Sequence, residues 1–190
     1  MLLSSRDLEA NALSFRKQLN LSEDEPLDPL KLKISGVQIV TVDQIDGVCD
    51  QTRKHLSEVA HDQWSAMSVP LDDDHSSWLI VVNHAHDPRR QRVSVAEELW
   101  HIFQGDELTE IVKVGPVYGR NFKKEEEDSA FYLAAASLLP QGIIKKLVTS
   151  NETAEKIAEK FGVSKELVEY RIKRLGLWNR YKKREIKLEN

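Results

Sequence analysis

The chain of 190 residues is poor in cysteine, and its single one, Cys49, excludes an internal disulfide and any cluster of thiolate ligands. A metal ion bound here must therefore be held by nitrogen and oxygen atoms, which excludes a structural zinc finger. The sequence also lacks an apolar run of signal-peptide or membrane-spanning length, because charged residues follow shortly after the first three. We therefore expect a cytoplasmic protein that makes no membrane contact.

Internal repeats and low-complexity segments are also absent, so the length favours one core with a small extension. The formal net charge of -4 hides an asymmetry along the chain. Residues 141–190 carry 13 lysines and arginines against 7 glutamates, whereas residues 1–140 carry 14 against 24 acidic residues. This basic C-terminal part is either a solvated surface or a face that meets nucleic acid or an acidic partner.

The spacing of apolar residues predicts an amphipathic helix over residues 5–19. Three stretches of alternating character then predict a small three-stranded antiparallel sheet: VQIVTVDQI, WSAMSVP and SSWLIVVN. After them the pattern predicts helices over 94–104, 123–139, 142–149, 152–161 and 164–175. The order of helix, strands and helices indicates an α+β fold.

The stretch VSVAEELWHIFQGD, residues 93–106, holds the first candidate functional residues. On a helix, Glu97 and His101 lie one turn apart on one face, with Glu98 beside them. Two ligands at this spacing converge on one ion, as in the HExxH motif of zinc proteases, and the carboxylate after the first ligand takes a proton from water. The competing interpretation is a capping box, in which Glu97 bonds back to the amide of Ser94.

The stretch EEEDSAFYLAAASLLP, residues 125–140, holds the next candidate. On a helix, Glu127 shares a stripe with Ala130, Ala134 and other apolar residues, which directs a carboxylate into an apolar interface. The alanines allow a second helix to approach closely, and a buried carboxylate needs a partner. The alternative is a solvated acidic first turn stabilised by the helix dipole.

Together these stretches resemble the ImmA/IrrE metallo-endopeptidase family, a zincin group of bacteria, phages and mobile elements. Its pattern is a strand, a basic stretch, AHExxH and then ExxAxxFAaxLLxP. Here the pattern appears as LIVVNHAHDPRRQRVSVAEELWHIFQGD and EDSAFYLAAASLLP. The matching positions are Arg92, Ala96, Glu98, His101, Glu127, Ala130, Ala134, Ala135, Leu138 and Pro140. The departure is Glu97, where the family has its first zinc-binding histidine.

The resemblance implies a divalent-metal site of His101, Glu127 and Glu97, with Glu98 as the catalytic base. Zinc is the expected ion, and manganese is the alternative because carboxylates favour harder ions. His84 and His86 are additional candidate ligands, since both follow the third strand. The resemblance also implies a zincin-like domain over 1–140, followed by a helical extension over 141–178 and a basic tail over 179–190.

Residues 153–176, TAEKIAEKFGVSKELVEYRIKRLG, have the spacing of a helix-turn-helix, with Gly162 at the turn. The second helix would present Lys165, Arg171 and Arg174 to DNA. Glutamates on the same helix oppose phosphate binding, so the structural interpretation of the helix pair is favoured over nucleic-acid contact.

Two functions follow from these patterns. The first is a metallo-endopeptidase that cleaves or binds a regulatory, repressor-like protein, as the resemblance implies. The second is a catalytically inactive regulator that keeps the scaffold and binds DNA or protein through the helix pair or the basic tail.

Overall fold

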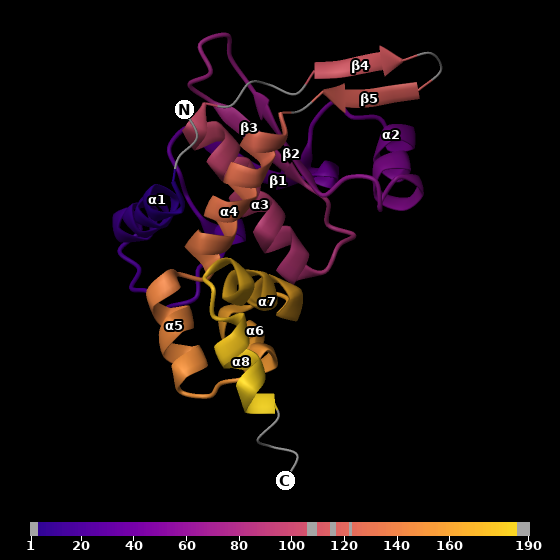
Figure 1. The fold of residues 1–190 in the computed structure, drawn as a ribbon. Helices are drawn as coiled ribbons and strands as arrows, with labels where there is room; N and C mark the ends of the chain where they lie inside the picture. The colour runs from indigo at the N-terminus through magenta and orange to yellow at the C-terminus, as the bar shows by residue number, and fades with distance from the viewer. Residues whose placement is uncertain (1–3, 106–109, 115–116, 122, 186–190) are drawn as a thin grey trace.

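The computed structural model describes residues 4–105, 110–114, 117–121 and 123–185 (Figure 1). The helices are α1 (Ser5–Gln18), α2 (Asp50–Lys54), α3 (Pro88–Gln104), α4 (Lys124–Leu138), α5 (Gln141–Thr149), α6 (Ala154–Phe161), α7 (Lys165–Arg174) and α8 (Trp178–Glu185). The strands are β1 (Val37–Thr41), β2 (Ala66–Pro70), β3 (Trp78–Val82), β4 (Glu110–Val114) and β5 (Val117–Asn121). Short helical segments are η1 (Pro29–Lys31), η2 (Val42–Gln44) and η3 (His55–Val59). None of the described helices is long and apolar enough to span a membrane.

The α+β class is confirmed, and the three predicted strands form one sheet in the order β1-β3-β2. The sheet is mixed, because β3 pairs with β2 antiparallel and with β1 parallel. The expectation of a purely antiparallel sheet is therefore wrong at β1. The physical reason is the long connection between β1 and β2, which contains η2, α2 and η3 and lets the chain cross over before β2 turns back into β3.

Helix α3 packs against β2 and β3 on one side and against α4 on the other. A small apolar cluster fills the space between the sheet and α3: Ile80, Val82, Val95 and Leu99. The larger core lies around α4, which also packs against α1 and α7. In Figure 1, α3 and α4 run side by side at the centre, and α5 to α8 gather at the end of the molecule away from β4 and β5.

Helix α3 begins six residues earlier than the pattern of apolar residues predicted. Asp87 caps it by accepting a hydrogen bond from the amide of Arg89, and Pro88 occupies its first turn. Ser94 therefore lies inside the helix, where its own amide belongs to the regular helical pattern. The capping-box interpretation of Ser94 and Glu97 is wrong, which leaves the Glu97 side chain available for another role.

Further strands and helices lie where the sequence pattern predicted none. The hairpin of β4 and β5 connects α3 to α4, and α2 with η3 fills the connection after β1. The predicted basic tail is helical as far as residue 185, because Tyr181 is buried and its hydroxyl accepts a 2.9 Å hydrogen bond from the amide of Ala154. Residues 186–190 of the predicted tail lie outside the described part of the chain.

The expected helix pair of residues 153–176 is formed by α6 and α7. Gly162 ends α6 in the left-handed conformation with φ of 63°. Ala158 and Val168 are both buried, as a close crossing of the two helices requires. Both helices contribute to the same core as α1 and α4.

Candidate metal centre

Helix α3 supplies two of the candidate ligands from one face. Glu97 and His101 lie four positions apart, which places their side chains one above the other. The opposite face of α3 carries buried Val95 and Leu99 against the sheet and fixes the rotation of the helix. The sequence therefore directs the polar pair away from the sheet and towards α4.

Helix α4 supplies Glu127 from its first turn. Ala130 and Ala134 are completely buried, and their small side chains allow α3 and α4 to approach closely. Two hydrogen bonds also join these helices. The indole Nε1 of Trp100 donates to Ser137 Oγ over 3.0 Å, and Ser129 Oγ donates to Gln104 Oε1 over 3.2 Å.

The side chains of Glu97, His101 and Glu127 meet between the two helices. Each offers one ligand atom, and the three atoms lie within 4.8 Å of one another. His101 Nε2 lies 3.8 Å from Glu127 Oε1. All three residues are partly buried, so the group is neither sealed in the core nor spread over the surface.

The electrostatics of this group are unbalanced in favour of negative charge. Burial raises the pKa of Glu97 to about 7, and the nearby carboxylates of Glu127 and Glu98 act in the same direction, while His101 opposes the rise. Two carboxylates thus lie near a single imidazole, and Glu98 adds further negative charge beside Glu97. Such a site favours the binding of a cation, which would replace the lost solvation of Glu97.

The donor set fits a divalent metal ion. Two carboxylate oxygens and one imidazole nitrogen are ligands of zinc at closely similar distances, and three protein ligands leave a coordination position open. Oxygen-rich sets also suit manganese. The ligand atoms lie up to 4.8 Å apart, and side-chain rotation is enough to bring them closer around an ion. Glu97 and Glu127 each have three rotatable bonds for this movement.

Glu98, the expected base, follows Glu97 on α3 and turns towards the sheet. Its Oε2 accepts a 2.7 Å hydrogen bond from Ser68 Oγ on β2. Ser68 was not predicted from the sequence as a functional residue. The only available signal was strand alternation, which places Ser68 on the face of β2 that packs against α3, opposite its exposed neighbour Val69.

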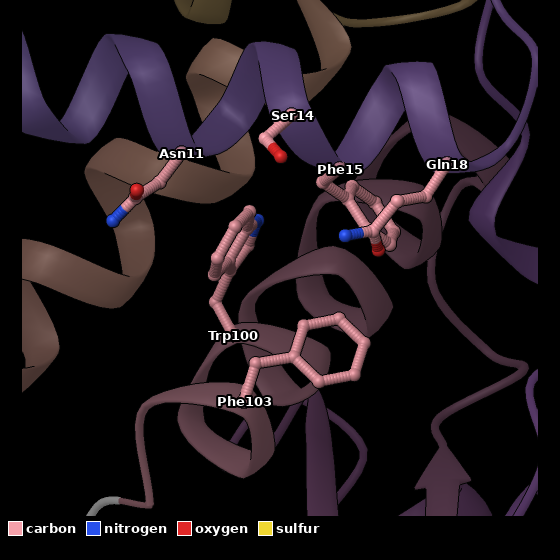
Figure 2. Close-up of a pocket in the computed structure, with 6 residues that line it drawn as sticks. All are labelled: Asn11, Ser14, Phe15, Gln18, Trp100 and Phe103. Atoms are coloured by element: carbon pink, nitrogen blue, oxygen red, sulfur yellow. The ribbon is translucent and has the colours of Figure 1, made fainter.

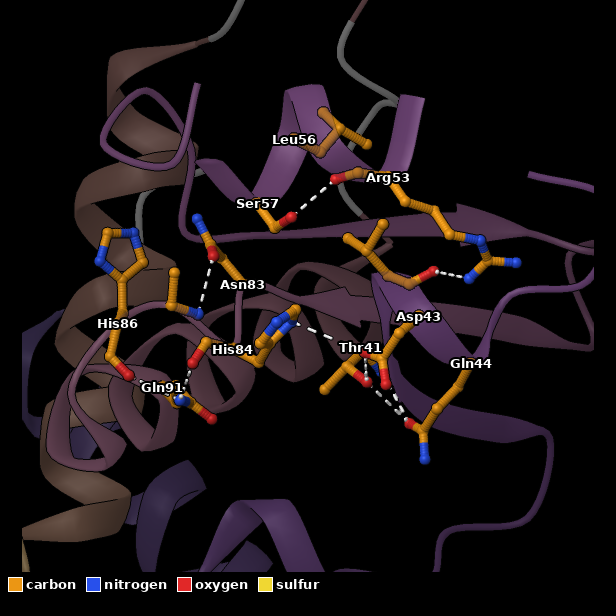
Figure 3. A network of polar contacts seen from close by, with 12 residues as sticks. Thr41, Asp43, Gln44, Arg53, Leu56, Ser57, Asn83, His84, His86 and Gln91 are labelled. Carbon is orange, nitrogen blue, oxygen red and sulfur yellow. Dashed lines mark hydrogen bonds and ion pairs between the residues drawn. The ribbon is translucent and has the colours of Figure 1, made fainter. Parts of the chain in front are cut away.

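His84 and His86 do not join the group of three among the residues that the structure describes. Figure 3 shows His84 beside Asp43, with 3.6 Å between Nδ1 and Oδ1. His86 makes a 2.8 Å hydrogen bond through Nε2 to the carbonyl oxygen of Trp64. Both histidines closely follow Asn83, a completely buried residue that donates to the carbonyl oxygens of His61 and Trp64. This network holds the chain between β3 and α3.

The arginines of the basic stretch have structural partners. Arg92 Nε lies 3.2 Å from Asp28 Oδ1, and its Nη1 donates to the carbonyl oxygen of Gly162. Arg90 donates to Ser65 Oγ over 2.8 Å. These contacts tie the first turns of α3 to the segment before β2, to Asp28 and to the end of α6.

The three residues proposed for DNA contact have different surroundings. Arg171 is completely buried and donates through Nη2 to both carboxylate oxygens of Glu9, at 2.8 and 3.0 Å. It is therefore not presented on the surface, because it is held by Glu9 of α1 and by the carbonyl oxygen of Leu139 after α4. Lys165 is exposed but forms an ion pair with Glu155, and Arg174 lies over the rings of Tyr132 and Tyr170.

A groove of about 240 Å³ lies between α1 and α3, beside Trp100 and Phe103. Figure 2 shows its lining: Asn11, Ser14, Phe15, Gln18, Trp100 and Phe103. The rings of Phe15, Trp100 and Phe103 are packed with centroids 5.5 to 5.7 Å apart. The lining contains no carboxylate or histidine, so the groove is chemically distinct from the candidate metal centre.

The sequence model of the IrrE N-terminal-like domain, a peptidase family, matches residues 58–173. The chain belongs to this family. The matched range contains α3, α4 and all of Glu97, Glu98, His101 and Glu127. The IrrE-like region also reaches through α6 and almost to the end of α7, so the helix pair is part of the family's domain.

A solved structure with a similar fold is a transcriptional regulator of Mycobacterium tuberculosis. The identity is 16%, the TM-score is 0.53, and the likeness covers 87% of this IrrE-like chain and 46% of the regulator. The chain thus spans about half the length of that protein, and the likeness concerns the fold alone. No curated protein shows significant sequence similarity to the chain.

Proposed function

We propose that this protein is a metal-dependent peptidase that acts on a regulatory protein and holds a divalent ion, most naturally zinc, through Glu97, His101 and Glu127. The observation that carries the proposal is the convergence of these three ligand atoms from two helices within 4.8 Å. Membership of the IrrE N-terminal-like domain family supports it. The resemblance to the ImmA/IrrE family supports a repressor-like protein as the substrate.

A divalent ion bound there would act as a Lewis acid that activates water and polarises a peptide carbonyl. Glu98 accepts the proton of the attacking water and delivers it to the departing amine nitrogen. Glu98 suits this role because it is next to Glu97 in α3 and is held by Ser68. The alanines of α4 keep Glu127 close to His101, so the ligands are arranged before the ion binds.

Glu98→Gln tests this assignment, because the amide keeps the shape of the side chain but does not accept the proton. The metal-loaded protein is incubated with a proteome-derived peptide library, and new termini are detected by mass spectrometry. We expect cleavage by the parent protein and a loss of about a hundredfold or more in Glu98→Gln, with unchanged metal content. Equal cleavage by both proteins would show that Glu98 is structural.

The second candidate function is a regulator that binds the ion without hydrolysis. The observation that favours it is Glu97, since a third carboxylate near the ion makes the activated water less acidic than an imidazole ligand would. In that case the parent protein takes up metal but produces no new termini from the library. Binding of the regulatory protein without cleavage would then be the activity to measure.

A further inference from the structure

Ser68 contacts the candidate base from an element that carries none of the ligands. It lies in the middle of β2, where it pairs with Ile80 of the central strand β3. Its hydroxyl reaches across to α3 and donates to Glu98 Oε2 over 2.7 Å. The donor is therefore fixed by a paired strand, and the acceptor by a helix packed on that strand.

The Glu98 carboxylate needs such an anchor. Glutamate has three rotatable bonds, and the neighbouring carboxylate of Glu97 repels it. Within the described residues, the contact with Ser68 is the hydrogen bond that restrains this side chain. Because it occupies Oε2, the second oxygen, Oε1, is left to accept a proton. A charge-assisted bond of this length also fixes the plane of the carboxylate.

We propose that Ser68 is a positioning residue that holds Glu98 in the orientation required for proton transfer; this inference rests on the proposed function. Among the described residues, Ser68 forms no hydrogen bond with any of the three ligands, so its loss acts on the base and leaves the metal affinity unchanged. It contributes through Glu98 alone.

The experiment measures acetohydroxamate binding to the zinc-loaded protein by calorimetry. This small ligand chelates the metal and gives up its hydroxyl proton to a nearby carboxylate, so it reports on the base without a known peptide substrate. The variants are Ser68→Ala, Ser68→Thr and Glu98→Gln. Ser65→Ala is the matched control, because Ser65 is a half-buried neighbour whose hydroxyl accepts from Arg90 instead.

We expect Ser68→Ala to weaken acetohydroxamate binding roughly tenfold, as for a lost hydrogen bond to a charged group. Ser68→Thr should restore it, because the hydroxyl is kept on a strand position that accepts threonine. Zinc affinity should stay at the parent value in all these variants, which a merely structural role would not predict. Ser65→Ala should bind like the parent.

Two results would overturn the inference separately from the function. If Ser68→Ala binds acetohydroxamate like the parent while Glu98→Gln does not, Glu98 is the acceptor but Ser68 does not position it. If Ser68→Thr binds as weakly as Ser68→Ala, the hydroxyl is not the cause. Should the parent take up no zinc, the proposed function fails and this inference fails with it.

Discussion

At the residue scale, Glu97 is the position at which this chain departs from the HExxH motif of the family. The motif leads one to expect a neutral imidazole at this position, and the structure has a carboxylate whose pKa is raised to about 7 by burial and by neighbouring negative charge. Replacing histidine by Glu97 carries an electrostatic cost and no steric one, since the Glu97 side chain still reaches His101 and Glu127. A bound cation would offset that cost.

The raised pKa of Glu97 predicts a pH-dependent stability of the metal-free protein. Below the ordinary pKa of 4.5 the carboxyl group is neutral in both states, and above about pH 7 it is charged in both, partly buried in the folded protein and solvated in the unfolded chain. Between these values the folded protein keeps the proton that the unfolded chain releases. Stability should therefore fall as the pH rises from about 4.5 to about 7, by up to roughly 3 kcal/mol. Thermal unfolding with a chelator, from acid to neutral pH, measures this.

Glu97→Gln should remove this part of the pH dependence, because the amide does not ionise. Glu125→Gln is the control, since Glu125 is exposed in the first turn of α4 and should leave the pH profile as in the parent. Superimposable profiles for the parent and Glu97→Gln would contradict the assigned burial and crowding of this carboxylate.

At the element scale, the site depends on how closely α3 and α4 approach. Ala130 is completely buried one turn after Glu127, so Ala130→Leu should force the helices apart and destabilise the fold by about 1–3 kcal/mol. Zinc affinity should fall with it, because Glu127 moves away from His101. Thermal unfolding and zinc titration measure the two effects.

Ala10→Leu, at an exposed position of α1, is the control. If the zinc affinity of Ala130→Leu equals that of the parent, the close approach of α3 and α4 does not support the site.

The helices of the site were predictable from sequence because their apolar spacing is regular and their residues match a family pattern. The start of α3 was missed although Asp87 and Pro88 are a strong starting signal, since the apolar pattern begins only at Val93. The parallel pairing of β1 was not predictable, because strand alternation says which residues share a face and nothing about the neighbouring strand. Ser68 was likewise hidden, as its contact with Glu98 joins positions thirty residues apart.

At the scale of the whole molecule, Arg171 and Glu9 connect the C-terminal helices to α1. The pair is buried, and Glu9 also accepts a 2.6 Å hydrogen bond from the hydroxyl of Tyr132. A basic residue on a helix of this kind suggested surface contact, and only its contacts with Glu9 of α1 and the carbonyl oxygen of Leu139 show otherwise. The buried ion pair of Arg171 and Glu9 thus joins α7 to α1, and the sequence alone did not indicate this pairing.

Arg171→Met should destabilise the protein by about 3–5 kcal/mol, because it leaves Glu9 as an uncompensated buried charge. Lys165→Met is the matched control, since Lys165 is an exposed cation of the same helix whose ion pair with Glu155 lies at the surface. The midpoint of denaturant unfolding should therefore change in the first variant and remain near the parent value in the second. Equal midpoints in both would show that the buried pair is not a support of the fold.

The central claim is that Glu97, His101 and Glu127 hold one divalent ion, and zinc titration of the intact protein by calorimetry tests it most directly. We predict one site in the parent, no binding in His101→Ala or Glu127→Ala, weaker binding in Glu97→Ala, and tighter binding in Glu97→His, which restores a neutral nitrogen ligand. The result that would contradict the account is a parent protein that takes up no divalent ion, or one whose zinc affinity is the same in His101→Ala and Glu97→His as in the parent.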